Sequence, residues 1–554
     1  MAVRRDRAGL SALALYATLA FLLFGLRLAT DAGSTYSGTG RDPQLFIWAF
    51  AWWPHAILHG LNPFVTHAAW APDGINLAWT TAVPGLALLF APLTLAAGPV
   101  VSYNVAAVLM PALAAWTAFL LCRDLTRRLW PSLVGGYLFG FSSYMLGEQL
   151  GHIHATSAFL VPLIALVMLR YVRGDLSGRA LVVRLAPLLA LQLLFATEFA
   201  FTLTLAVASS LVIGAAVAPA FRARLVASLV PLAGSYLLAA VVTSPFLYFL
   251  LTGFHSSSYH VETYNTDLLN FVVPTPLTLS GESWAGPISQ HFPGNISERG
   301  AYLGVPTLAI VALYVWKRAR TAGGRFLIAS FALAVIAALG TNIVIDGHSS
   351  TRLPWTLVGH LPLFDNVLPE RFTLYVSLAA ALIVALWTAS CGRGVLHWLL
   401  PALAIVAIVP HFSTSTWVTS YAVPPFFTDS SYRSCLEPGE NILPLPVAVD
   451  GDSDLWQAES GFRFTMAGGY VAAGPPRSFL TPDSVAWIAR GNPAQPDQVQ
   501  MLVTYIHDKH VTSVVVDKRQ KLWAAVVDRI AAPHDVGGVL LYHVAGPGPS
   551  CPAS

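Results

Sequence analysis

Long uncharged apolar runs are the feature of this sequence that most restricts its fold. A helix needs about 20 apolar residues to cross the hydrocarbon core of a bilayer. The runs that approach this length lie near residues 9–29, 101–122, 131–146, 156–172, 182–197, 199–219, 225–251, 301–316, 325–341, 372–391 and 396–411. The pattern predicts an α-helical polytopic membrane protein with about eleven transmembrane helices.

The composition fits a chain that is largely covered by lipid. Only 11% of the 554 residues are charged, whereas soluble domains carry about 25%. The formal net charge is +3 and there is no basic block with interleaved aromatic residues, which argues against a nucleic-acid partner. Arginine greatly outnumbers lysine, and alanine and leucine are abundant, which is typical of a GC-rich bacterial genome.

Basic residues between the runs predict how the chain crosses the membrane. The apolar segment 82–98 contains Pro84 and Pro92, and we expect it to lie in the interface or to re-enter without spanning. With a cytoplasmic N-terminus, the basic clusters at 123–128, 170–184, 222–224, 317–325 and 393 then all face the cytoplasm, as the positive-inside rule requires. This predicts a multi-pass protein of the cytoplasmic (inner) membrane, with its C-terminal region outside the cytoplasm.

The last part of the chain has a different pattern. We expect residues 1–411 to form the transmembrane domain and residues 412–554 a small extracytoplasmic α/β domain, because short β-like runs alternate there with helical ones. It has no glycine-rich phosphate loop, metal-spaced Cys/His cluster or nucleophile elbow, so structural cover or acceptor binding is favoured over catalysis. Cys435 and Cys551 bracket this domain, either as a disulfide or as two free thiols.

The first candidate for chemistry is Asp42, in the long outside segment between the first two spans. It precedes Pro43 and an aromatic helix, so it is suited to be the N-cap of that helix. A carboxylate at the membrane surface can also act as a general base on a hydroxyl. The two roles are compatible, because a capping aspartate is well oriented.

A second group of polar residues follows at the outside ends of later spans. Glu148, His152 and His154 lie within seven residues, and metal binding is one reading of them. The i, i+2 spacing of the histidines points them to different faces of a helix, so hydrogen bonds to a polar substrate or phosphate are favoured. Glu198 ends an apolar run, where a carboxylate is costly unless it is paired or binds sugar hydroxyls.

Two further candidates lie in the second half of the membrane region. Glu298 is our choice from the long polar loop 252–300, because it directly precedes the next span. Arg371, at the outer end of the tenth span, is suited to bidentate phosphate contacts at the lipid boundary. The alternative for Arg371 is simple snorkelling of its charge to water.

The order of these features resembles the C-type (GT-C) membrane glycosyltransferase superfamily over roughly the first 410 residues. The matching strings are Arg41-Asp42-Pro43-Gln44 to Trp53, Phe141-Ser142-Ser143-Tyr144 with Gly151-His152, Asp267-Leu268-Leu269-Asn270-Phe271 to Pro274, Tyr302-Leu303-Gly304, and Pro369 to Arg371. The resemblance implies an inverting enzyme of the cell envelope that takes a sugar from a polyprenyl-phosphate donor. The acceptor would be a glycan, lipid or protein, and membrane lipids would be the other partners.

The resemblance also assigns roles to the candidate residues. Asp42 matches the catalytic acid of the first outside loop. Arg41 stands where some members have a second acid, which leaves a divalent metal cofactor open. Arg371 would bind the donor phosphate, and the substrate-binding set would be Glu148, His152, His154, Glu198 and Glu298. The rival interpretations are a transporter or flippase of lipid-linked glycan precursors and a catalytically inactive scaffold.

Overall fold

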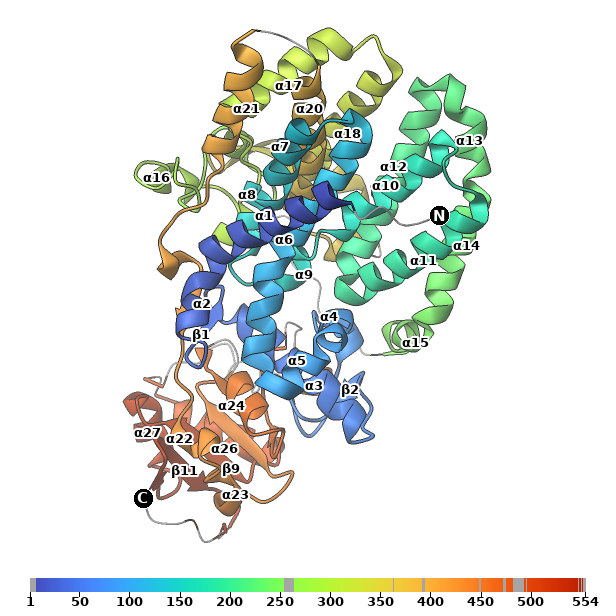
Figure 1. Ribbon diagram of the computed structural model, residues 1–554. Coiled ribbons are helices and arrows are strands. Elements are labelled where there is room, and N and C mark those ends of the chain that lie inside the picture. The colour runs from blue at the N-terminus through green and yellow to red at the C-terminus, as the bar shows by residue number, and fades with distance from the viewer. Residues whose placement is uncertain are drawn as a thin grey trace.

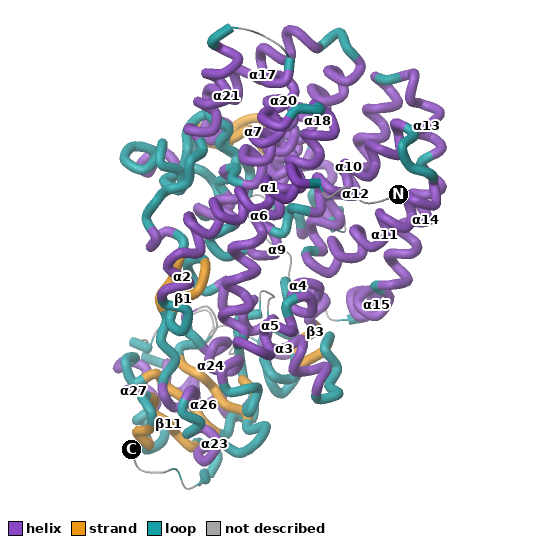
Figure 2. Tube along the Cα trace, viewed as in Figure 1, coloured by secondary structure: helices purple, strands orange, loops and turns teal. Residues whose placement is uncertain are grey.

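The chain folds into a large helical part and a smaller sheet domain, which lie at opposite ends of the molecule (Figures 1 and 2). The computed structural model describes residues 6–253, 264–361, 363–390, 394–447, 450–471, 475–481, 493–494, 496–546, 548–549 and 551. Arg393, the last of the predicted cytoplasmic basic residues, lies outside these ranges. So does segment 254–263 of the long polar loop.

Eight helical stretches in the described residues are long and apolar enough to cross a membrane. They are Arg7–Thr30 (α1, Arg7–Ala20, to α2, Leu26–Thr30), Pro99–Thr126 (α6), Ile153–Arg173 (α9, Ile153–Thr156, and α10, Leu160–Arg173), Gly178–Phe195 (α11), Thr197–Val217 (α12), Pro219–Val242 (with α13, Arg222–Ala227, and α14, Leu229–Val242), Ala322–Leu339 (α18) and Pro369–Ala389 (with α20, Thr373–Ala389). The multi-pass helical fold predicted from the sequence is therefore confirmed.

The other three predicted spans form shorter helices, so eight of the eleven predicted spans meet the length criterion among the described residues. They are α7 (Leu129–Gly140), α17 (Val305–Arg318) and α21 (Leu396–Ala407). Twelve residues, as in α7, extend only about 18 Å, against about 30 Å of hydrocarbon. The apolar run continues beyond α7, but the helix breaks where the Ser142 side chain accepts a hydrogen bond from the Met145 amide and starts α8 (Ser143–Glu148).

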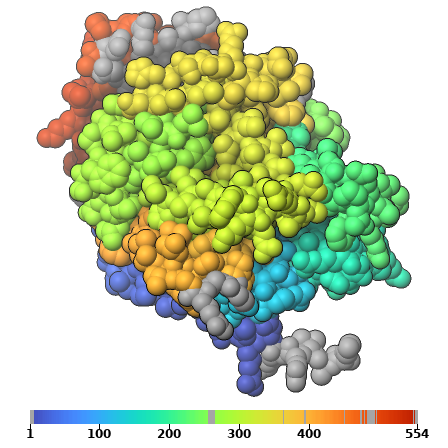
Figure 3. Space-filling model, turned by 90° about the horizontal axis from the view of Figure 1, so that it is seen from above, coloured from blue at the N-terminus to red at the C-terminus, as the bar shows by residue number. Residues whose placement is uncertain are grey.

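Close packing fixes the centre of the helical part. Helix α7 packs on α6, and a Cβ placed on Gly140 would come within 2.4 Å of the backbone nitrogen of Ala115. Only glycine permits this approach of two backbones. Seen from above, residues 264–361 form much of one face, in green to yellow (Figure 3). Within this part, α8 contacts the turn Ile296–Glu298, and both α12 and α20 contact α18.

Segment 31–98 connects the helical part to the sheet domain. It contains β1 (Thr35–Ser37), α3 (Asp42–Leu58), β2 (Val65–Thr66), β3 (Ile75–Asn76), α4 (Pro84–Leu89) and α5 (Ala91–Ala97). Helix α3 buries Trp48 and Trp53 almost completely. The apolar run 82–98 forms the two short helices α4 and α5, neither of which has the length of a span.

The sheet domain is a small α/β unit, as predicted. Its sheet has the strand order β10-β11-β9-β7-β8, with β7 parallel to both β8 and β9. The strands are β7 (Asn441–Leu445), β8 (Thr465–Met466), β9 (Ser513–Asp517), β10 (His534–Val536) and β11 (Val539–His543), and the main helices are α24 (Ser453–Glu459), α26 (Gln498–Asp508) and α27 (Lys521–Val527). Cys435 and Cys551 form a disulfide, the first of the two alternatives.

Direct hydrogen bonds join the sheet domain to segment 31–98. Strand β1 pairs with β6 (Val418–Ser420), which leads into the sheet domain. The indole nitrogen of Trp48 donates a 2.6 Å hydrogen bond to the buried side chain of Gln457, in α24. The backbone of Met466 bonds to Ala68. Because these contacts hold α24 against α3, the sheet domain forms one wall of the region around Asp42.

Candidate functional site

The seven candidate residues come together in one polar cluster at the boundary of the helical part. They lie on separate segments: Asp42 at the start of α3, Glu148 at the end of α8, His152 and His154 around the start of α9, Glu198 at the start of α12, Glu298 in the turn Ile296–Glu298 and Arg371 in the turn Pro369–Phe372. Hydrogen bonds and ion pairs connect all seven. These residues were predicted individually from the sequence, and they are neighbours in the structure.

The centre of the cluster is a chain of hydrogen bonds from Asp42 through His152 to Glu148. Nε2 of His152 lies 3.0 Å from Oδ2 of Asp42, and Nδ1 lies 2.6 Å from Oε2 of Glu148. Both ring nitrogens therefore face carboxylate acceptors, an arrangement that suits the doubly protonated imidazolium. His152 holds the orientation of Asp42 from the inner side of the cluster.

Asp42 does not act as the helix cap that the sequence suggested. Helix α3 begins at Asp42, its N-cap position is Arg41, and no side chain caps it. The carboxylate of Asp42 is used elsewhere, since Oδ2 faces His152 and Oδ1 accepts a 2.5 Å hydrogen bond from the hydroxyl of Tyr470. Asp42 thus connects the helical part to the sheet domain.

The second feature of the cluster is the buried guanidinium of Arg371, whose residue is 9% exposed. Its Nη2 donates a 2.7 Å hydrogen bond to Glu298, its Nε donates to the other oxygen of Glu298, and its Nη1 donates to Glu198. Nε also lies 3.7 Å from Oε1 of Glu148. Arg371 is therefore surrounded by carboxylates and does not extend its charge into water.

His154 reaches the same cluster, although its i, i+2 spacing from His152 predicted different faces of a helix. His152 precedes α9, so the two residues do not share one helix. Nε2 of His154 lies 3.5 Å from Nη1 of Arg371, and its ring stacks on Phe46 at 5.5 Å between centroids. Its other ring nitrogen is buried and has no hydrogen-bond partner among the described residues.

Electrostatics set the protonation of the central groups. Burial opposes the charge of Asp42, but the hydrogen bond and charge of His152 hold its pKa below the ordinary value. Burial also opposes the charge of His152, yet Glu148 and Asp42 raise its pKa to about 10. Burial and then the charge of Glu298 raise the pKa of Glu148 to about 7. Asp42 is therefore an ionised acceptor at neutral pH and His152 a cation.

One part of the cluster has the donor set of a divalent-metal site. Glu148, His152 and Glu298 each offer a ligand atom, and these atoms lie within 4.8 Å of one another. Oε1 of Glu148 is buried without a hydrogen-bond partner among the described residues. Two carboxylates and one imidazole suit a divalent cation, so the residues fit. Such binding requires His152 to release the proton on the nitrogen that turns to the metal.

Two further residues belong to this site and were not selected from the sequence. Glu370 is 1% exposed, and its Oε1 accepts hydrogen bonds from the Gly300 amide and the Thr373 hydroxyl. The sequence signal that could have identified Glu370 is an acidic residue at the end of an apolar run. Tyr470 carried no such signal, because it lies 428 positions from Asp42 in a region without a recognisable motif.

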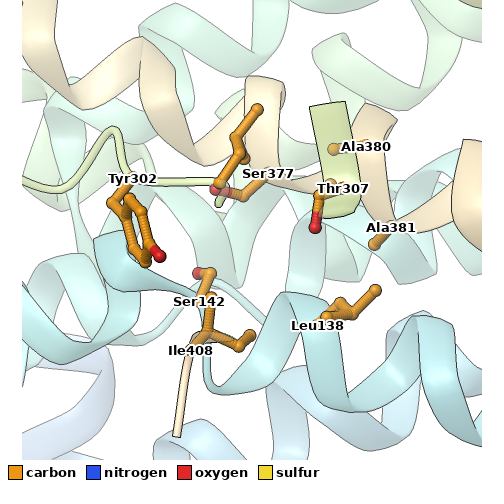
Figure 4. A pocket seen from close by; sticks show the side chains of 9 residues that line it. Leu138, Ser142, Tyr302, Thr307, Ser377, Ala380, Ala381 and Ile408 are labelled. Atoms are coloured by element: carbon orange, nitrogen blue, oxygen red, sulfur yellow. The ribbon is translucent and has the colours of Figure 1, made fainter. Parts of the chain in front are cut away.

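Two cavities bear on what the site can hold. The first, between α7, α17 and α20, has a volume of about 10 Å³ and is lined by residues such as Ser142, Thr307 and Ser377 (Figure 4). It has room for about one water molecule, and none of the cluster residues lines it. The second is a cleft of about 550 Å³ between segment 31–98 and the sheet domain, and Arg41 and Asp452 lie in its wall.

Comparisons with known proteins identify the fold. The structure is similar to the oligosaccharyltransferase of Archaeoglobus fulgidus in its apo form, with a TM-score of 0.56 and 13% identity over 95% of this chain and 72% of that one. It is also similar to the arabinofuranosyltransferase AftD from Mycobacteria, with a TM-score of 0.59 and 17% identity over 99% of this chain and 40% of that one. The chain thus has the GT-C fold of membrane glycosyltransferases.

Sequence comparison places the chain in a family. No curated protein matches it. The family model described as "Domain of unknown function (DUF6311)" matches residues 13–419, which include every residue of the cluster except Tyr470. The chain therefore belongs to the DUF6311 family.

Proposed function

We propose that this protein is an inverting glycosyltransferase of the cell envelope. It would move a sugar from a polyprenyl-phosphate donor to an acceptor hydroxyl at the outer face of the cytoplasmic membrane. The GT-C fold supports the general class of reaction. The acidic cluster at the end of the membrane helices supports a reaction at the lipid–water boundary, since buried charges in a membrane protein are costly unless they are used.

The observation that carries this proposal is the unequal exposure of the clustered acids. The Asp42 side chain is 36% exposed, against 0% for Glu148 and 2% for Glu298. A general base must be within hydrogen-bond reach of the proton that it removes. Asp42 alone among these three carboxylates combines a rigid position, set by His152, with a face that an acceptor hydroxyl can reach.

The proposed chemistry uses a negatively charged group, Asp42, and a positively charged group, Arg371. Asp42 accepts the proton as the acceptor oxygen attacks the anomeric carbon, and the phosphate of the donor leaves from the opposite side, which inverts the configuration. Arg371 supplies positive charge to the phosphate. Among the described residues, Glu298 accepts a hydrogen bond from one of the two N–H groups on Nη2 of Arg371. A divalent cation held by Glu148, His152 and Glu298 would add positive charge for the phosphate.

The remaining acids and histidines would bind substrate hydroxyls and keep Arg371 in place. Glu198 ties Arg371 to the start of α12 and also accepts a hydrogen bond from the backbone of Leu368. Nε2 of His154 faces Arg371, and its buried Nδ1 has no hydrogen-bond partner among the described residues. These contacts support a donor-sugar position between Asp42 and Arg371.

We also propose that the sheet domain and the site face the outside of the cell. The disulfide between Cys435 and Cys551 requires an oxidising compartment, which lies outside the cytoplasm in bacteria. The basic clusters between the spans favour the same orientation. On the outer face, the enzyme would meet a lipid-linked donor whose sugar already projects from that leaflet.

The test is sugar transfer by purified protein in detergent, supplied with a panel of polyprenyl-phosphate sugars. We expect wild type to transfer and Asp42→Asn to lose about 10²–10⁴-fold in rate, the range for removing a general base. Asp31→Asn is the matched control, because Asp31 is an exposed acid of the same segment. Movement of lipid-linked sugar across liposomes, unchanged by Asp42→Asn and without transfer, would instead identify a transporter.

A further inference from the structure

We propose that the cleft beside Asp42 binds a carbohydrate unit of the acceptor, so that the acceptor is a glycan. This inference rests on the proposed glycosyl transfer and adds the chemical class of the acceptor to it. It is carried by the position of the cleft, by the side chains that line it and by the contacts that make it rigid.

The position of the cleft is the first argument. The residues that line it include Tyr36, Arg41, Thr419, Tyr421, Asp452 and Arg519. Its volume of about 550 Å³ falls within the range of about 300–1,000 Å³ usual for small-molecule sites. Arg41 directly precedes Asp42, and consecutive Cα atoms are about 3.8 Å apart. The wall of the cleft therefore includes the residue next to the proposed base.

Asp42 contacts both the polar cluster and the sheet domain, which contributes residues to the cleft wall. On the inner side, Oδ2 of Asp42 meets His152, which connects to Glu148. On the other side, Asp42 meets Tyr470 of the sheet domain, and the sheet domain also supplies Asp452 to the cleft wall. Transfer between two substrates requires such an arrangement, because donor and acceptor must reach one base from different sides.

The lining of the cleft has the chemistry that sugar rings need. A sugar ring presents a face of C–H groups, which packs on an aromatic ring, and an edge of hydroxyls, which bond to charged side chains. Tyr421 is partly exposed and is backed by the buried ring of Tyr36, with 5.6 Å between ring centroids. The guanidinium of Arg519 and the ion pair between Arg41 and Asp452 supply donors and acceptors.

The cleft is also fixed in shape before any ligand arrives. Asp452 accepts a 2.6 Å hydrogen bond from the side chain of Gln44, in addition to its ion pair with Arg41. The hydroxyl of Tyr36 donates to the backbone of Gly40, and β1 is paired with β6. A preformed site loses little entropy on binding.

A glycan fits this lining better than a peptide. Grooves for helical peptides offer aliphatic pockets, whereas the side chains of this cleft are two tyrosines and several charged or hydroxyl-bearing groups. On the β6 side, Thr419 is also engaged, because its hydroxyl donates to the backbone of Gly38. The apolar contact offered by the cleft is thus mainly aromatic, as for a sugar face.

The experiment measures oligosaccharide binding and transfer on the same full-length protein in nanodiscs. The probe is a panel of tri- and tetrasaccharides of neutral hexoses, pentoses and N-acetylhexosamines, followed by saturation-transfer NMR. We expect at least one to bind wild type and to bind Tyr421→Ala and Arg519→Ala about tenfold more weakly. Tyr421→Phe keeps the ring and should bind as wild type does.

Lys518→Ala is the matched control, because Lys518 is the exposed cation next to Arg519 and pairs with Asp535 outside the cleft. In transfer assays, Tyr421→Ala and Arg519→Ala should raise the KM for the glycan acceptor and leave the KM for the lipid donor unchanged. If Tyr421→Ala fails to fold, Arg519→Ala still tests the cleft. The Arg519 side chain is 63% exposed, so its removal should leave the fold intact.

The outcomes separate this inference from the proposed function. Transfer by wild type with an unchanged acceptor KM in both variants would overturn the cleft as acceptor site and leave the enzyme intact. Binding of an oligosaccharide that both variants lose, without transfer from any donor, would keep the carbohydrate site and overturn the proposed reaction. Peptide binding that both variants lose, with no saccharide bound, would replace the glycan by a peptide.

Discussion

The hydroxyl of Tyr470 donates a 2.5 Å hydrogen bond to Oδ1 of Asp42. Tyr470 follows β8 in the sheet domain, and Asp42 begins α3 in segment 31–98. The backbone amide of Tyr470 also bonds to Asp454, at the start of α24. The sheet domain therefore touches the proposed base directly, and its role extends beyond structural cover.

Replacing Tyr470 by phenylalanine should raise the pKa of Asp42. The hydroxyl stabilises the charged carboxylate, so its loss favours the protonated form. A hydrogen bond to a charged group is worth on the order of 1.5 kcal/mol, which corresponds to about one pH unit. We expect the acid limb of the pH profile of kcat/KM to move upward by up to that amount in Tyr470→Phe.

Tyr542→Phe is the control for this prediction. It removes a similar bond between a tyrosine hydroxyl and a carboxylate, the 2.9 Å contact with Asp528, within the sheet domain. It should leave the acid limb in place. An acid limb that is the same in Tyr470→Phe and wild type would show that the bond to Tyr470 does not set the ionisation of Asp42.

Asp454 predicts a pH dependence of stability. Burial raises its pKa to about 7, against 3.8 ordinarily, so the folded protein holds this proton more tightly than the unfolded chain does. Stability is therefore lost as the pH rises from about 4 to 7, and the full loss persists above 7. Asp454→Asn should raise the melting temperature by several degrees at pH 8 and leave it nearly unchanged at pH 4.

The measurement is thermal unfolding of the purified protein at both pH values, with Asp535→Asn as the control. Asp535 is exposed and paired with Lys518, so its replacement should not produce a gain that grows with pH. An equal change in melting temperature at pH 4 and pH 8 for Asp454→Asn would contradict the assignment of a buried, protonated carboxyl.

Much of the site was predictable because charges in an apolar sequence are conspicuous. Glu198 and Arg371 stand at the ends of long apolar runs, where only a partner or a function compensates for their cost. Their mutual contact was not predictable, since they lie 173 positions apart and hydropathy carries no information on which helix ends meet. The same limit applies to Tyr470, whose residue type is common in any folded domain.

The lengths of the helices were less predictable than their existence. Hydropathy counts apolar residues in a window, and the run 131–146 satisfies that count. It does not register that Ser142 caps a new helix and ends the earlier one at Gly140. The pairing of Cys435 with Cys551 was likewise open in the sequence, because spacing alone does not bring two cysteines together.

The donor set of Glu148, His152 and Glu298 predicts binding of a divalent cation such as Mn²⁺. A ligand that binds only the folded state stabilises it by about 2.7 kcal/mol at a hundredfold excess over its Kd. We expect Mn²⁺ to raise the melting temperature of wild type, and more strongly as the pH rises, because His152 must lose a proton to bind it. Glu298→Gln should abolish the shift.

Asp346→Asn is the control for the cation experiment. Asp346 also pairs with a histidine, His291 at 3.0 Å, but both side chains are about half exposed and lie outside the cluster. This variant should respond to Mn²⁺ as wild type does. The same thermal shift in wild type, Glu148→Gln and Glu298→Gln would show that Mn²⁺ binds elsewhere. The negative charges of the cluster would then be balanced by bound protons and Arg371 alone.

The disulfide between Cys435 and Cys551 predicts a reductant-sensitive sheet domain. It closes a loop with a sequence separation of 116, and loss of such a bond costs on the order of 2–5 kcal/mol. We expect Cys435→Ser and Cys551→Ser to lower the melting temperature similarly, and reductant to lower that of wild type but of neither variant. Cys122→Ser is the control, because Cys122 is a buried free thiol of α6. Maleimide labelling of both cysteines in unreduced, unfolded wild type would show that the bond does not form in the cell.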